Sequence, residues 1–269
     1  MLLAIPFPMI DPVLVEIGPI VIRWYALAYI AEILLGWRLA RVLVQRPPVV
    51  ATREQVDDFI TWVTLGIILG GRLGYVLFYR PGYYVTAPWE ALYVWQGGMS
   101  FHGGALGVII AAWLFSRRHG LDWVAFADRV VCVVPIGLFL GRLANFINSE
   151  LWGRVTDVPW AMVFPNGGPE PRHPSQLYQA FLEGACLFAL LMILARSERI
   201  RAKPGFLAGA FLAGYGVARI IGEFFRQPDA HLGFLVAGAT MGQLLSLPMI
   251  MAGAWLMLRA KERPGGHDV

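Results

Sequence analysis

Residues 123–147 read WVAFADRVVCVVPIGLFLGRLANFI, a long run of mostly apolar side chains. Because a helix needs about 20 such residues to cross the hydrocarbon core of a bilayer, this stretch predicts a membrane-spanning helix. Apolar runs of similar length lie on both sides of it. The candidate spans are roughly 20–43, 59–78, 99–115, 123–147, 177–195, 206–225 and 234–258. The sequence therefore predicts an all-α polytopic membrane protein of about seven transmembrane helices, with residues 1–269 in a single integral membrane domain.

The composition agrees with this class. Hydrophobic residues make up 57% of the chain and charged residues 15%, against roughly 25% charged residues in an ordinary soluble domain. The net charge of +4 is spread over short loops without interleaved aromatic residues, so no nucleic-acid partner is expected. Cys132 and Cys186 both fall inside apolar runs, and we expect buried thiols with no disulfide.

The basic residues predict the orientation. They gather around 38–53, 117–118, 196–203 and 259–263, whereas the other side holds Arg80, Arg154, Arg172 and Arg226. Since basic loops stay in the cytoplasm, the N-terminus is expected outside and the C-terminus in the cytoplasm. The N-terminus has no basic region, so no cleavable signal peptide is expected, and residues 2–10 should lie along the interface.

Two outer segments are long enough to hold structure of their own. Residues 80–97 are rich in tyrosine and tryptophan, which is typical of the membrane interface, and residues 149–174 are rich in proline and glycine. Together they predict a small cap on the outer face.

Glycine recurs at four-residue spacing in two predicted helices. Gly66, Gly70 and Gly74 share one face of the second span, and Gly137 and Gly141 share one face of the fourth. Both faces are expected to pack closely against another helix.

Polar groups at membrane depth mark the candidate functional residues, because an ionisable side chain there costs on the order of 2.5–3.5 kcal/mol. The fourth span continues into GRLANFINSELWG at 141–153. At 3.6 residues per turn, Arg142, Asn145 and Ser149 fall on one face. The alternative is structural, with Arg142 reaching the interface and Asn145 cross-linking helices.

The sixth span carries a second charged set. Arg219 and Glu223 are four residues apart, and Arg226 follows on the same stripe. A structural ion-pair ladder is one interpretation. However, one carboxylate cannot neutralise two guanidiniums, and surplus positive charge favours an anion such as phosphate, which arginine binds in bidentate fashion.

A histidine between glycine pairs opens the third span, in GGMSFHGG at 97–104. Glycine lets the backbone approach a ligand and imidazole is a base near neutral pH, so His102 is a candidate base; the alternative is a structural histidine. Glu32 and Glu183, inside spans, are expected to form hydrogen bonds within the bundle. Ser175, after His173, is expected to cap the fifth span.

Together these stretches resemble the prolipoprotein diacylglyceryl transferase family over essentially the whole chain. The polar motif at 141–153 is the most specific match. Other stretches match in the family's order, namely Arg23–Tyr25, Gly97–Gly104, His173–Tyr178, Tyr215–Asp229 and Met241–Met249. Two departures are Ala26, where the family usually has Gly, and Gln179, where Glu is common.

The resemblance implies a reaction and its partners. The family moves the diacylglyceryl unit of phosphatidylglycerol to the lipobox cysteine thiol in the signal peptide of a preprolipoprotein. A thioether forms and glycerol phosphate leaves, which is the first step of bacterial lipoprotein maturation. The protein is then expected in the bacterial inner (plasma) membrane with a periplasmic N-terminus, and acyl chains enter sideways from the surrounding membrane lipids.

The marked residues fit this chemistry. His102 would take the thiol proton, because a free thiol has a pKa of about 8.5. Arg142 and Arg219 would stabilise charge on the departing phosphate, and Tyr25 is grouped with these as catalytic. The residues expected to bind phosphatidylglycerol are Arg142, Asn145, Glu150, Gly153, Arg219 and Glu223. No metal or cofactor is expected, because the sequence shows no ligand cluster at metal spacing.

Other functions stay open at this point. A membrane transporter for an anionic solute also uses intramembrane arginines, but it predicts inverted halves that the unlike spans do not show. An intramembrane protease needs a Ser–His pair, and Ser100 and His102 stand too close in sequence. A metal-dependent phospholipid-head transferase needs an Asp-rich membrane motif, which the sequence lacks.

Overall fold

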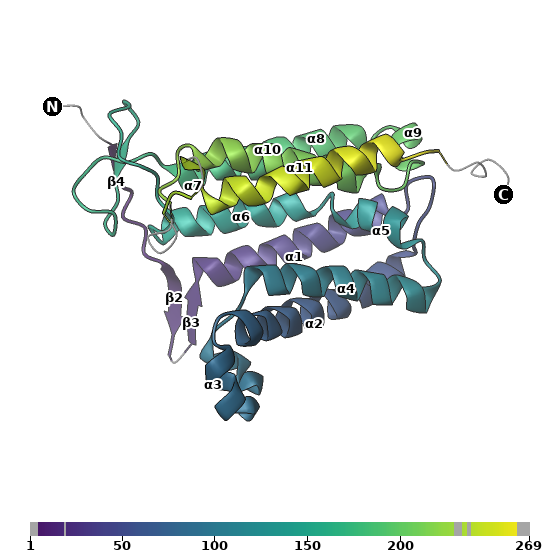
Figure 1. Ribbon diagram of the computed structural model, residues 1–269, viewed down its shortest axis with the longest axis horizontal. Helices are drawn as coiled ribbons and strands as arrows, with labels where there is room; N and C mark the ends of the chain where they lie inside the picture. Colours follow the sequence, from purple (N-terminus) through teal and green to yellow (C-terminus); the bar gives the residue numbers. More distant parts are fainter. Residues whose placement is uncertain (1–4, 19, 229–232, 236–237, 263–269) are drawn as a thin grey trace. The chain divides into compact units, whose positions relative to one another are not determined.

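The computed structural model describes residues 5–18, 20–228, 233–235 and 238–262, and this part of the chain is mostly helical (Figure 1). In that part, five helical segments are long and apolar enough to cross a membrane, namely Arg53–Phe78, Trp123–Ile147, Ser175–Leu194, Phe206–Glu223 and Met241–Arg259. The expected helical, polytopic character is thereby confirmed. The other two predicted spans are also helices, α1 (Trp24–Leu43) and α4 (Phe101–His119), but they do not combine the same length and composition.

Several boundaries differ from the prediction. α1 begins at Trp24, because the four residues before it form strand β3 (Ile20–Arg23), which pairs antiparallel with β2 (Val13–Ile17). α2 (Arg53–Phe78) and α11 (Met241–Arg259) each start directly after a threonine cap, so α2 begins earlier and α11 later than predicted. The threonine and the glutamine three residues further on satisfy each other's backbone N–H groups, which fixes the first turn.

Two predicted spans are not uniform α-helices. The run at 123–147 divides into α5 (Trp123–Val130) and α6 (Val134–Ile147), because Pro135 in the first turn of α6 cannot continue an incoming helix. The fifth span consists of α7 (Ser175–Gln179), the π-helical segment η3 (Ala180–Cys186) and α8 (Leu187–Leu194). Both cysteines are free as expected, but Cys186 is exposed on the outside of this span and only Cys132 is buried.

The chain divides into two compact units. The first unit joins Met1–Ala40 to Asp128–Val269, and the second unit is the continuous stretch Arg41–Ala127. The second unit contains the short helical elements α3 (Pro81–Thr86), η1 (Pro88–Leu92) and η2 (Val94–Gln96). The first unit also contains β1 (Ile5–Pro6), β4 (Met162–Val163), α9 (Glu198–Arg201) and α10 (Phe206–Glu223).

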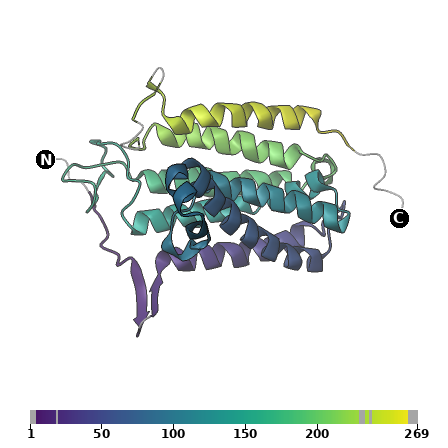
Figure 2. The same ribbon diagram turned by 60° about the horizontal axis from the view of Figure 1, so that its bottom comes forward.

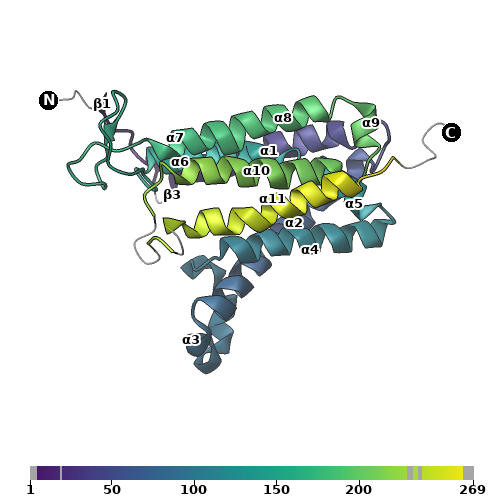
Figure 3. The same cartoon turned by 45° about the horizontal axis from the view of Figure 1, so that its top comes forward.

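In the second unit, α2 and α4 lie side by side through glycines (Figures 1 and 3). A Cβ added at Gly66 would lie 2.7 Å from the Gly107 carbonyl oxygen, and one at Gly74 would lie 2.8 Å from Gly103 Cα. The glycine face predicted on the second span is therefore a packing surface, as expected. It brings the two backbones too close together for any side chain.

The segment at 80–97 is attached to α2 by Arg72, which is 5% exposed. The Arg72 guanidinium donates to the carbonyls of Glu90 at 2.7 Å and Ala91 at 2.8 Å, and also to that of Gly97. An arginine inside a membrane helix is thus satisfied by backbone oxygens of the aromatic segment, which gives this segment a fixed conformation.

In the first unit, α6, η3, α10 and α11 pack in a bundle, with α10 and α11 running alongside each other (Figure 2). The predicted glycine face on α6 is only half correct. A Cβ at Gly137 would lie 2.9 Å from Glu32 Oε2 of α1, whereas nothing lies within 4 Å of one at Gly141. Gly137 therefore allows Glu32 of α1 to pack closely against α6, whereas Gly141 faces open space.

The N-terminal residues from Ile5 onward pair with the segment at 149–174. β1 pairs in parallel with β4, which lies within 149–174. Phe7, Phe146 and Phe164 form a buried aromatic cluster beneath this pairing. The segment at 149–174 is thus ordered, as its composition indicated. Residues 2–4 lie outside the described part, and the position of residues 2–10 along the membrane interface stays a prediction.

Candidate functional site

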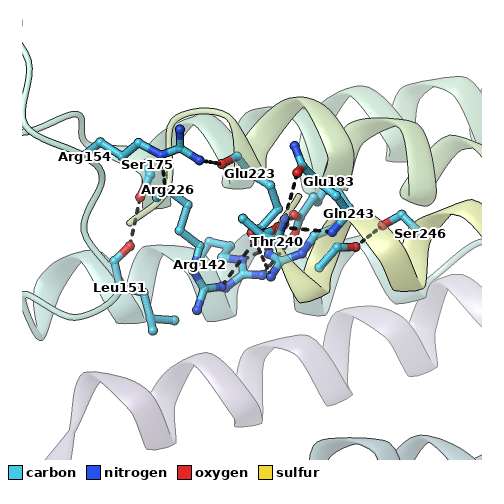
Figure 4. A network of polar contacts seen from close by, with 12 residues as sticks. Arg142, Leu151, Arg154, Ser175, Glu183, Glu223, Arg226, Thr240, Gln243 and Ser246 are labelled. Atoms are coloured by element: carbon cyan, nitrogen blue, oxygen red, sulfur yellow. Dashed lines mark hydrogen bonds and ion pairs between the residues drawn. The ribbon is translucent and has the colours of Figure 1, made fainter. Parts of the chain in front are cut away.

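The arginines predicted on two different helices meet on one buried carboxylate. Arg142 Nη2 on α6 lies 3.1 Å from Glu183 Oε2, and Arg219 Nη1 on α10 lies 3.4 Å from Glu183 Oε1. The Glu183 side chain is 0% exposed, while each arginine side chain keeps 15% of its surface open. Each oxygen of the Glu183 carboxylate contacts one arginine, and this holds the two guanidiniums near each other. Figure 4 shows Arg142, Glu183 and Glu223 in this network of polar contacts.

A second carboxylate extends this arginine cluster. Glu223 Oε1 lies 2.7 Å from Arg219 Nη2 and 4.0 Å from Arg226 Nη1. Its other oxygen accepts a hydrogen bond from Thr240 Oγ1 at 2.7 Å, at the start of α11. The predicted Arg219–Glu223 pair is confirmed. Arg226 lies beyond the end of α10 and reaches Glu223 from the segment that follows the helix.

The arginine cluster has more positive than negative charge. Among the described residues, the cluster holds the guanidiniums of Arg142, Arg219 and Arg154 beside the carboxylates of Glu183 and Glu223, which is an excess of one positive charge. Arg154 belongs to the cluster because its Nε donates to the Arg226 carbonyl and its Nη2 to the Glu223 carbonyl, both at 3.0 Å. In a site of low dielectric, this excess charge attracts an anion more strongly than it would in water.

A polar set adjoins the cluster one turn along α6. Asn145, 7% exposed, donates from Nδ2 to Tyr25 Oη of α1 and at 3.2 Å to Glu150 Oε2. Tyr25 was predicted from one stretch of sequence and Asn145 and Glu150 from another, and the structure brings the three together. Their oxygens and amide can take up hydroxyl or phosphate oxygens beside the guanidiniums.

The turn after α6 is strained and strongly held. Ser149 and Leu151 have φ of +54° and +55°, a left-handed conformation that costs about 1–2 kcal/mol for a side chain with a Cβ. The predicted placement of Ser149 on the Arg142 face is therefore wrong, because α6 ends at Ile147. Backbone strain of this kind is typical of functional sites.

Two residues of α7 fix this turn. Ser175 Oγ donates to the Leu151 carbonyl at 2.9 Å, and Gln176 Nε2 donates to the Glu150 carbonyl. The expectation that Ser175 caps its helix is wrong, because Pro174 holds the cap position and the hydroxyl is used by the turn.

Gly153 is placed by a close backbone approach. A Cβ here would lie 2.5 Å from the His173 carbonyl oxygen and 2.6 Å from that of Phe225. Its N–H donates to the His173 carbonyl at 2.9 Å, and Gly153 forms a β-bridge with Arg226. Gly153 thus ties the loop that carries Glu150 to the end of α10, and only glycine fits there.

The two predicted histidine positions lie in different units. His102 is an exposed residue in the first turn of α4 in the second unit, where Ser100 Oγ caps the helix by accepting from the Gly103 N–H at 3.2 Å. In the first unit, His173 lies 3.2 Å from Tyr178 Oη through Nδ1. Burial, and to a lesser degree the charge of Arg154, lowers the pKa of His173 from its usual value, which favours the neutral ring.

An apolar cavity of about 510 Å³ lies against the segment at 149–174. It is lined by aromatic side chains that include Trp160, Tyr178, Phe181 and Phe225. Phe225 directly precedes Arg226, so the cavity and the arginine cluster are close along the chain. A charged cluster next to an apolar space suits a molecule with an anionic part and a hydrocarbon part.

Sequence reasoning missed two residues of the arginine cluster. Glu183 was expected to form hydrogen bonds in the bundle, as it does, but its role between two arginines depends on contacts across three helices. Its signal was an acidic residue alone in an apolar run. Thr240 was detectable as the first residue of a Thr-x-x-Gln capping sequence. Asp229, at the end of one matching stretch, lies outside the described residues.

Comparison with known proteins identifies the family. A model of the family "prolipoprotein diacylglyceryl transferase" matches residues 12–259. A protein of Gluconacetobacter diazotrophicus named phosphatidylglycerol–prolipoprotein diacylglyceryl transferase is 62% identical over 266 residues, which cover 98% of this chain and 95% of that one. Proteins with the same name from Paramagnetospirillum magneticum and Azospirillum brasilense are 61% and 58% identical, each over 98% of this chain and 98% and 99% of their own. The chain therefore belongs to the prolipoprotein diacylglyceryl transferase family.

Proposed function

We propose that the chain transfers the diacylglyceryl group of phosphatidylglycerol to the cysteine thiol of a preprolipoprotein. Family membership and the names of relatives at 58–62% identity support this function. The observation that carries it in the structure is the arginine cluster, in which Arg142 and Arg219 from different helices share the buried Glu183 and Arg154 brings an excess of positive charge.

The charge balance of the reaction explains this excess. The thiol sulfur forms a bond to a glyceryl carbon, and the bond between that carbon and the phosphate oxygen breaks. The electrons of the broken bond leave with glycerol phosphate, whose phosphate gains one negative charge, and the thiol proton goes to a base. Guanidiniums held in place beforehand stabilise this growing charge without reorganisation.

Each candidate residue takes one part in this scheme. Arg142 and Arg219 bind the phosphate, and Glu223 holds Arg219 in place. Asn145 with Tyr25 and Glu150 binds oxygens of the phosphate or of the glyceryl part, next to the loop that Gly153 anchors. His102 accepts the thiol proton, a step worth roughly 10²–10⁴-fold in rate. No metal or cofactor takes part.

The membrane arrangement follows the charge distribution of the sequence. α1 and α4 cross the bilayer with the five longer apolar segments, so that residues 1–269 form one membrane domain of seven spans. The segments at 80–97 and 149–174 form a cap on the periplasmic face. The N-terminus is periplasmic and the C-terminus cytoplasmic, in the inner membrane of a bacterium.

A reconstituted assay tests the function. Purified protein in phosphatidylglycerol vesicles is given a signal-peptide fragment with its lipobox cysteine, and mass spectrometry measures the peptide. We expect a gain of one diacylglyceryl unit, no gain for the Cys→Ser peptide, and loss of at least about 100-fold in rate for Arg142→Lys and His102→Gln. An unmodified peptide, or anion flux from loaded vesicles in its place, would contradict the proposal.

A further inference from the structure

Three buried side chains beside the arginine cluster keep polar atoms without a partner. Among the described residues, none forms a hydrogen bond with Gln179 Nε2 or Oε1, with Gln176 Oε1 or with Ser149 Oγ. Gln176 and Gln179 are 0% exposed and Ser149 is 4% exposed. A native protein satisfies nearly all of its buried polar atoms, so a group of this kind needs an explanation.

The two glutamines lie on the same buried face of the fifth span as Glu183, which belongs to the arginine cluster. Gln176, Gln179 and Glu183 follow each other at spacings of three and four residues, and all three are fully buried. Gln176 also binds the carbonyl of the residue after Ser149, which brings the serine to the same end of α7.

Gln179 is wedged between this face and α10. A Cβ built on Gly222 would lie 3.1 Å from Gln179 Cγ and 3.7 Å from its Nε2. Gly222 precedes Glu223, and Glu183 lies four residues after Gln179. Gln179 therefore packs against the turn of α10 that carries Glu223, one helical turn before Glu183 in its own span.

The chemistry of the free atoms selects a ligand class. An amide offers donors and an acceptor, and a serine hydroxyl offers one of each, without charge. A hydroxyl group on a ligand can satisfy both kinds of atom. An ammonium group donates only, and it would also be repelled by the adjacent guanidiniums.

We propose that Gln179, with Gln176 Oε1 and Ser149 Oγ, forms a subsite for the hydroxyl groups of a polyol phosphate ester. This inference rests on the proposed function, in which the ester is phosphatidylglycerol and the polyol is its glycerol head group. Gln179 is then a positioning residue that holds the departing glycerol phosphate and rejects phospholipids with an ammonium head group. The same diol is carried by the lipid and by free glycerol phosphate, and both serve as probes.

The first experiment compares two lipids that differ only in these hydroxyls. Transfer to the lipobox peptide is measured from phosphatidylcholine vesicles that contain either phosphatidylglycerol or phosphatidylpropanol. We expect a kcat/KM ratio of about tenfold or more in favour of phosphatidylglycerol, because a site built for hydroxyls rejects the analogue without them. Gln179→Met should bring the ratio close to one, whereas Gln96→Met, at an exposed position of the second unit, should keep it.

A second measurement separates binding from folding. Because Gln179 has no partner to lose, Gln179→Met should leave the Tm unchanged or raised. Glycerol 1-phosphate should raise the Tm of the parent protein and propyl phosphate should raise it less, and this difference should vanish in Gln179→Met.

The outcomes are distinct. A parent protein that modifies no peptide contradicts the proposed function, while the difference in Tm between the two phosphates still decides the subsite. A parent that modifies peptide with the same lipid ratio in Gln179→Met overturns the subsite alone. A fall in Tm without a change in ratio assigns Gln179 a structural role and also overturns it.

Discussion

At the scale of single residues, Glu183 decides the geometry of the site. One carboxylate cannot cancel two guanidiniums, but it can position both, because each of its oxygens contacts one of them. Removing one partner from a buried ion pair costs about 3–5 kcal/mol, since the other charge stays buried without compensation. Here each arginine is a spare partner for the carboxylate if the other arginine is lost.

This arrangement predicts a non-additive pair of substitutions. Arg142→Met should destabilise the protein moderately, because Glu183 keeps Arg219. Arg219→Met should cost more, because Glu223 also loses its nearest guanidinium. The double variant should lose about 0.5–3 kcal/mol more than the sum of the two single losses. Denaturant unfolding in detergent measures all three.

The control for this cycle combines Arg142→Met with Arg199→Met, since Arg199 is exposed. That pair should be additive. Additive losses in the Arg142/Arg219 pair as well would mean that the two arginines do not share Glu183.

Sequence reasoning found the arginines but not what connects them. Arg142, Asn145, Arg219 and Glu223 could be selected because polar groups at membrane depth are costly and helical spacing is regular. The link through Glu183 joins residues 41 and 36 positions away in the chain, and no local pattern reports such a contact. Ser149 was misplaced because helical periodicity was continued past the point where the left-handed turn begins.

At the scale of elements, α2 and α4 show how a packing surface excludes side chains. Gly103 and Gly104 are neighbours on α4, yet their surroundings differ. A Cβ at Gly103 would lie 2.9 Å from Gly74 Cα, whereas the nearest atom to one at Gly104 is the Ile67 carbonyl oxygen at 3.7 Å. Only the first position is closed to a methyl group.

Alanine substitutions at Gly103 and Gly104 should therefore change the stability of the protein in opposite directions. Gly103→Ala should lower stability by about 1–3 kcal/mol, because the two helices must separate. Gly104→Ala should be neutral or stabilising by up to about 1 kcal/mol through its higher helix propensity. Thermal unfolding of both variants measures the difference, and equal losses would show that α2 and α4 do not pack through Gly103.

The two threonine caps form a second matched pair. Thr52 and Thr240 start α2 and α11 with the same capping box, but Thr240 also donates to Glu223 and is 3% exposed. Thr52→Val should cost about 1 kcal/mol of stability and leave transfer unchanged. Thr240→Val should cost more and slow transfer, because Glu223 loses a partner. The Tm and the initial rate of transfer are measured for both variants. Equal effects of the two substitutions on transfer would show that Thr240 does not support the site through Glu223.

The helices could be predicted from the apolar composition of their segments. Interruptions within a span and pairing between distant segments could be predicted only where a single residue marks them. Apolar runs gave every long helix. The division at Pro135 could be read from the proline, but the π-helical segment η3 has no such marker, since its backbone pattern depends on packing against α6 and α10. The strand pairing of β1 with β4 joins segments far apart in the chain, and their two-residue length leaves no alternation to detect.

At the scale of the whole molecule, the charge distribution gives a topology that can be measured. Asn166 lies in the segment at 149–174, and Glu198 lies in the basic stretch at 196–203, both exposed. In a background without Cys132 and Cys186, Asn166→Cys should react with a membrane-impermeant maleimide in intact spheroplasts. Glu198→Cys should react only after lysis. The reverse pattern would invert the orientation.

The two units differ in the number of chain segments that form them. The second unit is one continuous stretch, whereas the first joins residues up to Ala40 to those from Asp128 onward. A nascent chain can complete the continuous unit while synthesis proceeds. Tyr25 has to wait for Asn145, which leaves the ribosome 120 residues later. Glu223 likewise needs Thr240. We therefore expect the arginine cluster to be completed only after most of the chain has been synthesised, and a chain that stops before Thr240 to carry every arginine of the cluster without a finished site.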